Sequence, residues 1–234
     1  MMRLEGKVAI VSGGSRGIGR AIVRMLAAEG AAVTLVARNQ DAVARAVDEL
    51  RKERLDVEGL AVDVGVEAQV THLVQHVIHM HGHVDILVNN AGVGVFKPVT
   101  ELSVAEFDTM WGTNMRGAFL LTKAVLPHMI RVKSGEIVNI ASLAGKNSIK
   151  GGAGYCATKW ALRGFASSLM LEVREHNIRV STVFPGSVET AFSTTGKKGS
   201  NITQPEDVAD AVLFAITAPA RSMFSEIDVR PTRP

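Results

Sequence analysis

Two spacings of apolar residues alternate along the chain. Short runs of β-branched and aliphatic residues predict strands over 7–12, 32–37, 57–62, 84–89, 136–141, 178–184 and 225–230. Longer segments with a helical repeat of apolar residues predict helices over 17–29, 41–53, 67–81, 103–129, 155–176 and 205–217. Mostly apolar strands that alternate with helices are typical of a parallel sheet covered on both faces. No linker or repeat divides the chain, so we expect residues 1–234 to form one doubly wound α/β domain.

Polar residues and glycines gather where the predicted strands end. They comprise Ser12 to Gly19, Ala37 and Arg38, Asp63, Asn89 to Gly92, Ser142, and Pro185 with Gly186. In an open parallel sheet, ligands bind beyond the carboxyl ends of the strands, so we expect these residues to surround one site. The polar, glycine-bearing segment at about 187–204 has no clear element, and we interpret it as a mobile substrate loop over that site.

Composition narrows the class of protein. The chain has 234 residues, of which 47% are hydrophobic, and its formal net charge is +3, with basic and acidic residues interspersed. No basic run suits nucleic acid, and no apolar run approaches the roughly 20 residues that span a bilayer. The N-terminus lacks the features of a signal peptide, and one cysteine cannot form an internal disulfide. We therefore expect a soluble cytoplasmic protein that binds neither nucleic acid nor membrane.

Histidines and large aromatic residues offer further candidates. Five of the seven histidines lie within 72–83, and His72 and His76 have the spacing of a helical zinc site. This segment precedes the fourth predicted strand, away from the carboxyl edge, so we interpret it as a solvated helix face and expect no metal. Trp111, Phe119 and Trp160 lie on long predicted helices, and we expect them in the core or at a subunit interface.

The segment SGGSRGIG follows the first predicted strand and carries Gly13, Gly17 and Gly19. Glycines allow positive φ and let backbone N–H groups approach a pyrophosphate at a helix start, although a turn without a ligand could use them too. After the second strand, where NAD-preferring proteins often place an acid, the chain has Arg38. Arg38 and Arg16 favour the 2′-phosphate of NADP(H) over NAD(H); the alternative is that both are solvated surface residues.

The segment GYCATKW contains the only tyrosine of the chain, Tyr155, with Lys159 on the same predicted helix face. An ordinary phenol titrates near pH ~10, and a neighbouring ammonium favours the phenolate, so we expect a lowered pKa. Ser142 could hold a carbonyl oxygen while Tyr155 gives or takes a proton. The alternative is a half-buried tyrosine beside a lysine that reaches solvent. We interpret Cys156 as a small packed thiol.

These motifs occur together and in a fixed order: SGGSRGIG, NNAG at 89–92, TNM around Asn114, Ser142, Tyr155 with Lys159, and PG at 185–186. From about residue 7 to residue 190 the sequence resembles the short-chain dehydrogenase/reductase family. The resemblance implies a Rossmann fold with a seven-stranded sheet. It implies Tyr155 as acid/base, Ser142 orienting the substrate, Lys159 binding the nicotinamide ribose, and Asn114 holding a water that connects Lys159 to solvent.

The resemblance also implies a set of cofactor-binding residues. They are Gly13, Ser15, Arg16, Gly17, Ile18, Gly19, Arg38, Asp63, Val64, Asn89, Ala91, Gly92, Tyr155, Lys159, Pro185, Gly186, Val188 and Thr190. The substrate pocket would be formed by segments such as 93–96, 148–152 and 187–200. Asn89 and Asn90 have a further interpretation, as side chains whose hydrogen bonds fix a turn.

Within the family, the opening LEGKVAIVSGGSRGIGRAI and the helix YCATKWAL look closest to 3-oxoacyl-carrier-protein reductase-like members, whereas SEIDVRPTRP replaces their glycine-rich ending. The implied function is NADP(H)-dependent reduction of a ketone to an alcohol, with a 3-oxoacyl thioester as one candidate substrate. The alternatives are a non-catalytic NADP(H)-binding sensor and an alcohol dehydrogenase that works in the oxidative direction. Relatives form homodimers or homotetramers, so we expect an oligomer. Arg131, Lys133 and Arg174 could offer an acyl carrier a basic patch, or be ordinary surface charge.

Overall fold

Seven parallel strands form one sheet in the computed structural model, which describes residues 2–190, 192 and 202–232. The strands are β1 (Val8–Ser12), β2 (Ala32–Ala37), β3 (Val57–Ala61), β4 (Ile86–Asn89), β5 (Gly135–Ile140), β6 (Ile178–Pro185) and β7 (Glu226–Val229). Their order is β3-β2-β1-β4-β5-β6-β7, and every neighbouring pair is parallel. The order reverses between β1 and β4, which is where doubly wound sheets bind ligands. The predicted fold class and all the predicted strands are confirmed.

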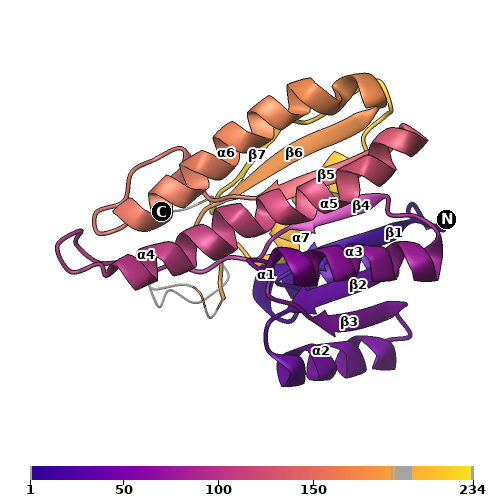
Figure 1. Ribbon diagram of the computed structural model, residues 1–234, viewed down its shortest axis with the longest axis horizontal. Helices are drawn as coiled ribbons and strands as arrows, with labels where there is room; N and C mark the ends of the chain where they lie inside the picture. Colours follow the sequence, from indigo (N-terminus) through magenta and orange to yellow (C-terminus); the bar gives the residue numbers. More distant parts are fainter. Residues whose placement is uncertain (1, 191, 193–201, 233–234) are drawn as a thin grey trace.

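Helices cover both faces of this sheet (Figure 1). On one face lie α1 (Gly17–Ala28), α2 (Gln40–Lys52) and α7 (Pro205–Ile216). On the other lie α3 (Glu67–His81), α5 (Gly117–Val132) and α6 (Ala153–Val173). In the described part of the chain, no helix has the length and apolar character needed to cross a membrane.

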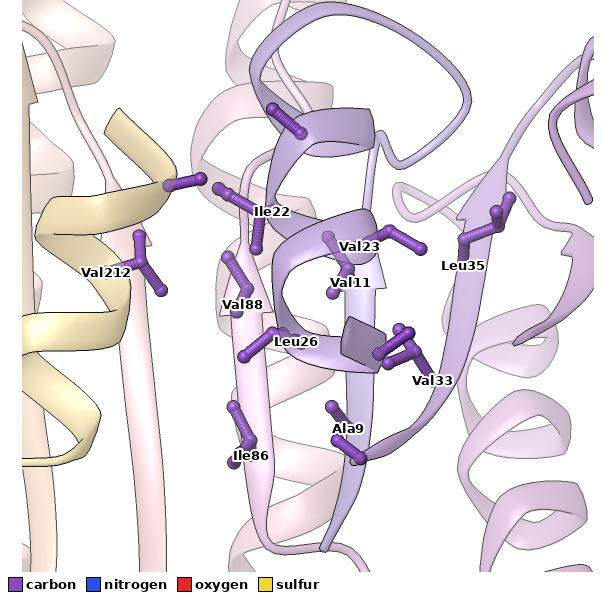
Figure 2. Packing of buried hydrophobic residues seen from close by; sticks show 14 of the residues in the cluster. Ala9, Val11, Ile22, Val23, Leu26, Val33, Leu35, Ile86, Val88 and Val212 are labelled. Atoms are coloured by element: carbon purple, nitrogen blue, oxygen red, sulfur yellow. The ribbon is translucent and has the colours of Figure 1, made fainter. Parts of the chain in front are cut away.

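The five inner strands bury both of their faces, whereas the edge strands β3 and β7 are only partly buried. Ala9 and Val11 of β1 belong to the core layer beneath α1, whereas Val8 and Ile10 belong to the layer beneath α3 and α5. Figure 2 shows the first of these layers, where Ile22 and its neighbours on α1 point toward β1, β2 and β4. Burial on both sides explains why the inner strands are mainly apolar runs in the sequence.

The single helix predicted over 103–129 is interrupted. Ser103 and Glu106 form a capping box at the start of α4 (Val104–Trp111). The next five residues, Gly112–Arg116, form a π-helical turn that leads directly into α5. Such a turn inserts one extra residue into a helix and is frequent at functional sites. One inserted residue barely changes the spacing of apolar residues. The sequence therefore predicted a continuous helix.

The exposed aromatic residues correct one expectation. Trp111, Phe119 and Trp160 are 41%, 43% and 47% exposed in the single chain. The interpretation of these residues as core is therefore wrong, because core side chains of this protein are almost fully covered. The alternative interpretation, a subunit interface, stays a prediction.

The predicted substrate loop at about 187–204 lies mostly outside the described residues. At its ends, the buried residues Val188 and Thr203 form a parallel bridge, and the Glu189 N–H donates to the Thr203 carbonyl oxygen at 2.9 Å. The two ends of the segment are thereby held together at the carboxyl edge of the sheet, next to the end of β6.

Candidate active site

A cavity of about 570 Å³ opens at the carboxyl edge of the sheet. Its walls come from the β1–α1 turn, the ends of β2, β4 and β5, and the first turns of α6. This volume is typical of small-molecule and cofactor sites. The fold brings most of the predicted cofactor residues into these walls: Gly13, Ser15, Arg16, Gly17, Ile18, Gly19, Arg38, Val64, Ala91, Gly92, Tyr155, Lys159 and Thr190.

The β1–α1 turn depends on glycine and on the adjacent loop after β4. Gly13 has a φ of +66°, and a Cβ at Gly19 would collide with the Gly13 carbonyl oxygen. The Ser12 hydroxyl oxygen accepts hydrogen bonds from the N–H groups of Asn90 (2.9 Å) and Ala91 (3.0 Å). The Asn90 side chain donates to the carbonyl oxygens of Ser12 (2.9 Å) and Gly13 (3.2 Å). The turn-fixing role predicted for Asn90 is confirmed.

Three arginines line one end of the cavity. Arg16 precedes α1, Arg38 follows β2, and Arg45 lies on α2. All three are exposed, and within the described residues none of their side chains has a hydrogen bond or ion pair. No Asp or Glu of the described residues lines the cavity. Uncompensated cations at a cavity wall attract an anionic group.

Tyr155 reaches the cavity from the first turn of α6, and only 6% of the residue is exposed. The Ser142 side chain, just after β5, is hydrogen-bonded to the phenol. Burial raises the pKa of Tyr155 to about 12, and the bond with Ser142 opposes this rise only in part. The phenol is therefore protonated at neutral pH and can act as a proton donor.

Lys159 shares the predicted helix face with Tyr155. Its Nζ lies 5.8 Å from the centroid of the Tyr155 ring and donates to the Ile140 carbonyl oxygen at 2.9 Å. Burial lowers the pKa of Lys159 to about 8. We predicted that Lys159 would lower the pKa of the phenol, but the structure gives a raised pKa. The reason is that burial, rather than the lysine charge, is the largest influence on the phenol.

Asn114 lies in the π-helical turn and is 1% exposed. Its Oδ1 accepts from the Val93 N–H (2.8 Å), and its Nδ2 donates to the Val93 carbonyl oxygen and to Thr158 Oγ1, both at 2.9 Å. A Cβ on Gly92 would lie 3.5 Å from Asn114 Oδ1 and 3.7 Å from Lys159 Nζ, so the two side chains flank Gly92. Asn114 thus connects the loop after β4 to α6 beside Lys159.

This order of strands, glycine turn and Ser–Tyr–Lys group matches a known family. The model of the short chain dehydrogenase family matches residues 7–201. The chain belongs to this family. An uncharacterised oxidoreductase of Staphylococcus epidermidis is 33% identical over 232 residues, covering 99% of this chain and 100% of the relative.

Two solved structures resemble this dehydrogenase along nearly its whole length. A metagenomic short-chain oxidoreductase in complex with NADP is 39% identical, with a TM-score of 0.88, and the match covers 99% of this chain and 100% of that one. An alcohol dehydrogenase from the archaeon Thermococcus sibiricus, complexed with 5-hydroxy-NADP, is 34% identical with a TM-score of 0.89; coverage is 97% of this chain and 98% of that one. The chain is an oxidoreductase with the Rossmann-like fold of the short-chain dehydrogenases.

Some predicted site residues of this dehydrogenase lie behind the cavity wall. The Asp63 carboxylate accepts from the Gly65 N–H (2.9 Å), and the Asn89 side chain donates to Asn139 Oδ1 (3.0 Å), between β4 and β5. The Gly186 N–H donates to the carbonyl oxygen of the last β7 residue (2.8 Å). These residues position the segments around the cavity. The predicted site residues that do not line it are Asp63, Asn89, Asn114, Ser142, Pro185, Gly186 and Val188.

Sequence reasoning missed several residues of the cavity wall. Arg45 is one, and the signal for it was a cation in the second turn of the helix that follows Arg38. Thr113 lines the cavity because the π-helical turn places it there, and no sequence pattern indicated that turn. Phe192 lies within the predicted pocket segment 187–200, but nothing distinguished it from its neighbours.

The histidine segment lies on α3. His76 is 3.4 Å from Glu58, and His72 is exposed. Among the residues that the structure describes, no group of three or more His, Cys, Asp or Glu side chains is arranged to hold a metal ion.

The basic patch considered for an acyl carrier lies far from Tyr155. Arg131 and Lys133 lie at the end of α5, and Arg174 directly follows α6. These helix ends lie at the amino edge of the sheet (Figure 1). The 21 residues of α6 span roughly 30 Å, and they separate Arg174 from Tyr155. The patch therefore does not place a carrier protein beside the phenol.

Proposed function

We propose that this dehydrogenase uses NADP(H) to reduce a ketone to an alcohol. A bound nicotinamide supplies the hydride that the carbonyl carbon accepts. Tyr155 donates its phenolic proton to the carbonyl oxygen, and Ser142 orients that oxygen. One observation carries this proposal, namely the buried phenol of Tyr155 in the wall of a cavity shaped by glycines, next to Lys159.

The residues present fit a dinucleotide phosphate. Gly17 has a φ of +55°, and a Cβ on Gly13 or Gly19 would meet backbone or Asn90 atoms, so bare backbone faces this part of the cavity. Arg16, Arg38 and Arg45 would hold the 2′-phosphate by charge-assisted hydrogen bonds. The NADP bound to the metagenomic oxidoreductase supports this preference.

The protonation states favour reduction. Oxidation of an alcohol needs the phenolate as base, and a pKa of about 12 makes that form scarce at neutral pH. Lys159, with a pKa of about 8, can exchange protons near neutral pH, and we assign it the reprotonation of Tyr155. Asn114, which flanks Gly92 with Lys159, would hold the connecting water. The oxidative direction is the second candidate, because a structural neighbour is an alcohol dehydrogenase.

We also propose that the dehydrogenase works as a homodimer or homotetramer. Phe107 and Trp111 stack at 6.2 Å on α4, both are exposed, and Trp160 is exposed on α6. Large apolar side chains that remain uncovered in one chain support a surface for self-association.

A substrate panel tests the proposed reaction. Ketones, quinones, steroids and 3-oxoacyl thioesters are incubated with NADPH and NADH in parallel, and the loss of reduced-nicotinamide absorbance is followed. We expect turnover of at least one carbonyl class, faster with NADPH. Tight NADPH binding without turnover across the panel would instead support a non-catalytic sensor.

A further inference from the structure

Two phenylalanines flank the ring of Tyr155. Phe96, in the segment after β4, has its ring centroid 5.2 Å from that of Tyr155, at an interplanar angle of 53°. Phe192, in the segment after β6, lies at 5.8 Å and 45°. These are the separations at which aromatic rings attract one another. Phe192 also lines the cavity and keeps 43% of its surface exposed, so part of its ring is available to a ligand.

Gly94 leaves the space in which these rings meet. A Cβ at Gly94 would lie 2.7 Å from Phe192 Cζ, 3.1 Å from Phe96 Cε2 and 3.3 Å from Tyr155 Cδ2. Around the Tyr155 ring, Met110 and further aliphatic side chains form a small apolar cluster. The ring of Tyr155 is therefore surrounded mainly by aromatic and aliphatic side chains, and the polar groups Ser142 and Lys159 are the exceptions.

Cations are absent from the exposed wall at this end of the cavity, as far as the described residues show. Lys159 lines it, but its ammonium is buried and bonded to a backbone carbonyl. Lys97 and Lys146 are paired with carboxylates, and the exposed Lys150 does not line the cavity. A carboxylate on the substrate would lose its water at this wall without gaining a partner among the described residues, which is costly.

We propose that the substrate is an uncharged ketone with an aromatic or similarly flat apolar group beside the carbonyl, and that Phe192 selects it. This inference rests on the proposed reduction. The flat group lies against the ring of Phe192, which lines the cavity, while the carbonyl oxygen faces the phenol of Tyr155. Phe96 packs on the Tyr155 ring without lining the cavity. A short aliphatic ketone leaves the Phe192 ring uncovered.

Kinetics with three ketones and NADPH test this selection. The ketones are acetophenone, butanone and the anionic 4-acetylbenzoate. We expect kcat/KM for acetophenone to exceed that of each other ketone by about tenfold or more. Phe192→Ala should lower kcat/KM for acetophenone about tenfold, mainly through KM, and lower that for butanone far less. Phe192→Tyr, which keeps the ring, should retain the preference.

Phe214→Ala is the matched control, because Phe214 is 54% exposed and packs on Phe224 at 4.4 Å on a different surface. We expect no change in preference for this variant. Equal losses on acetophenone and butanone in Phe192→Ala would overturn the role of Phe192. A preference of the unaltered protein for 4-acetylbenzoate or for an acetoacetyl thioester would overturn the substrate class and leave the reduction standing. Absence of turnover with every ketone, with NADPH bound, would contradict the proposed reduction itself.

Discussion

The amine of Lys159 is buried, where its charged form is less stable than in water. The residue is 4% exposed, and within the described part of the chain its ammonium donates only to the neutral carbonyl oxygen of Ile140. A buried ammonium without a carboxylate partner is less stable than in water, so its pKa falls to about 8. The protein therefore gives up folding stability at neutral pH in order to hold a lysine beside Tyr155.

This cost predicts a pH dependence of stability. The folded-state pKa of Lys159 is about 8, below the value of 10.5 for an exposed lysine, so the unfolded chain binds more protons between these pH values. The free energy of unfolding should therefore gain up to about 3 kcal/mol from this group as the pH rises from 7 to 10.5. Urea unfolding of the protein and of Lys159→Met at pH 7 and 10 measures the contribution.

Lys159→Met should be more stable than the unaltered protein at pH 7, and the difference should shrink at pH 10. Lys123→Met is the control, because Lys123 is exposed and paired with Glu67 on the surface. The same pH response in Lys159→Met and in the unaltered protein would show that the amine carries no burial cost.

Arg38 lines the cavity where we propose that the 2′-phosphate of NADP(H) binds. Arg38→Asp should raise the Kd for NADPH at least tenfold, because a charge-assisted hydrogen bond contributes about 1.5–3 kcal/mol. The Kd for NADH should change far less, since NADH has no 2′-phosphate for the new carboxylate to repel. Fluorescence titration with both cofactors measures this, with Arg174→Asp at the far end of α6 as control. Equal effects on the two cofactors would mean that Arg38 does not face the phosphate.

Among the secondary-structure elements, the β1–α1 turn and the π-helical turn shape the site. Only the β1–α1 turn could be predicted from the sequence. The β1–α1 turn could be predicted because its glycines are spaced as a phosphate-binding turn requires. The π-helical turn could not, because it arises where Asn114 bonds to Val93, a residue 21 positions earlier in the chain. Such non-local contacts leave no periodic signal in the helix that they distort.

Alanine substitutions at two helical glycines, Gly19 and Gly164, test whether the β1–α1 turn requires glycine. Gly19→Ala should destabilise the fold by about 2 kcal/mol or more and weaken NADPH binding, because the new methyl group collides with backbone. Gly164→Ala, on α6, meets no atom within 4 Å and should stabilise the fold by about 0.5–1 kcal/mol. Urea unfolding of both variants gives the comparison. A Gly19→Ala protein as stable as Gly164→Ala would show that the turn tolerates a side chain.

In the molecule as a whole, the catalytic cavity and a network of hydrogen bonds that stabilises the fold lie at opposite edges of the sheet. The cavity lies at the carboxyl edge, whereas Arg179, near the start of β6, donates to Glu136 (2.7 Å) and to the carbonyl oxygens of Ile216 (2.9 Å) and Ala218 (2.8 Å) at the end of α7. The sequence predicted the sheet well because buried parallel strands are continuously apolar. It predicted many of the residues that line the cavity at the carboxyl edge, but not Arg45 and Thr113, nor the pKa values of Tyr155 and Lys159. Those values depend on burial by segments distant in sequence.

In the proposed reaction, the Tyr155 hydroxyl delivers the proton to the carbonyl oxygen. Tyr155→Phe removes this one oxygen and leaves the ring that packs on Phe96 and Phe192. Steady-state kinetics of this variant with NADPH and the best ketone of the panel give kcat, and a fluorescence titration gives its Kd for NADPH. We predict that kcat falls by about 10²–10⁴-fold while the Kd stays within about threefold. A Tyr155→Phe protein that keeps its turnover would contradict the mechanism.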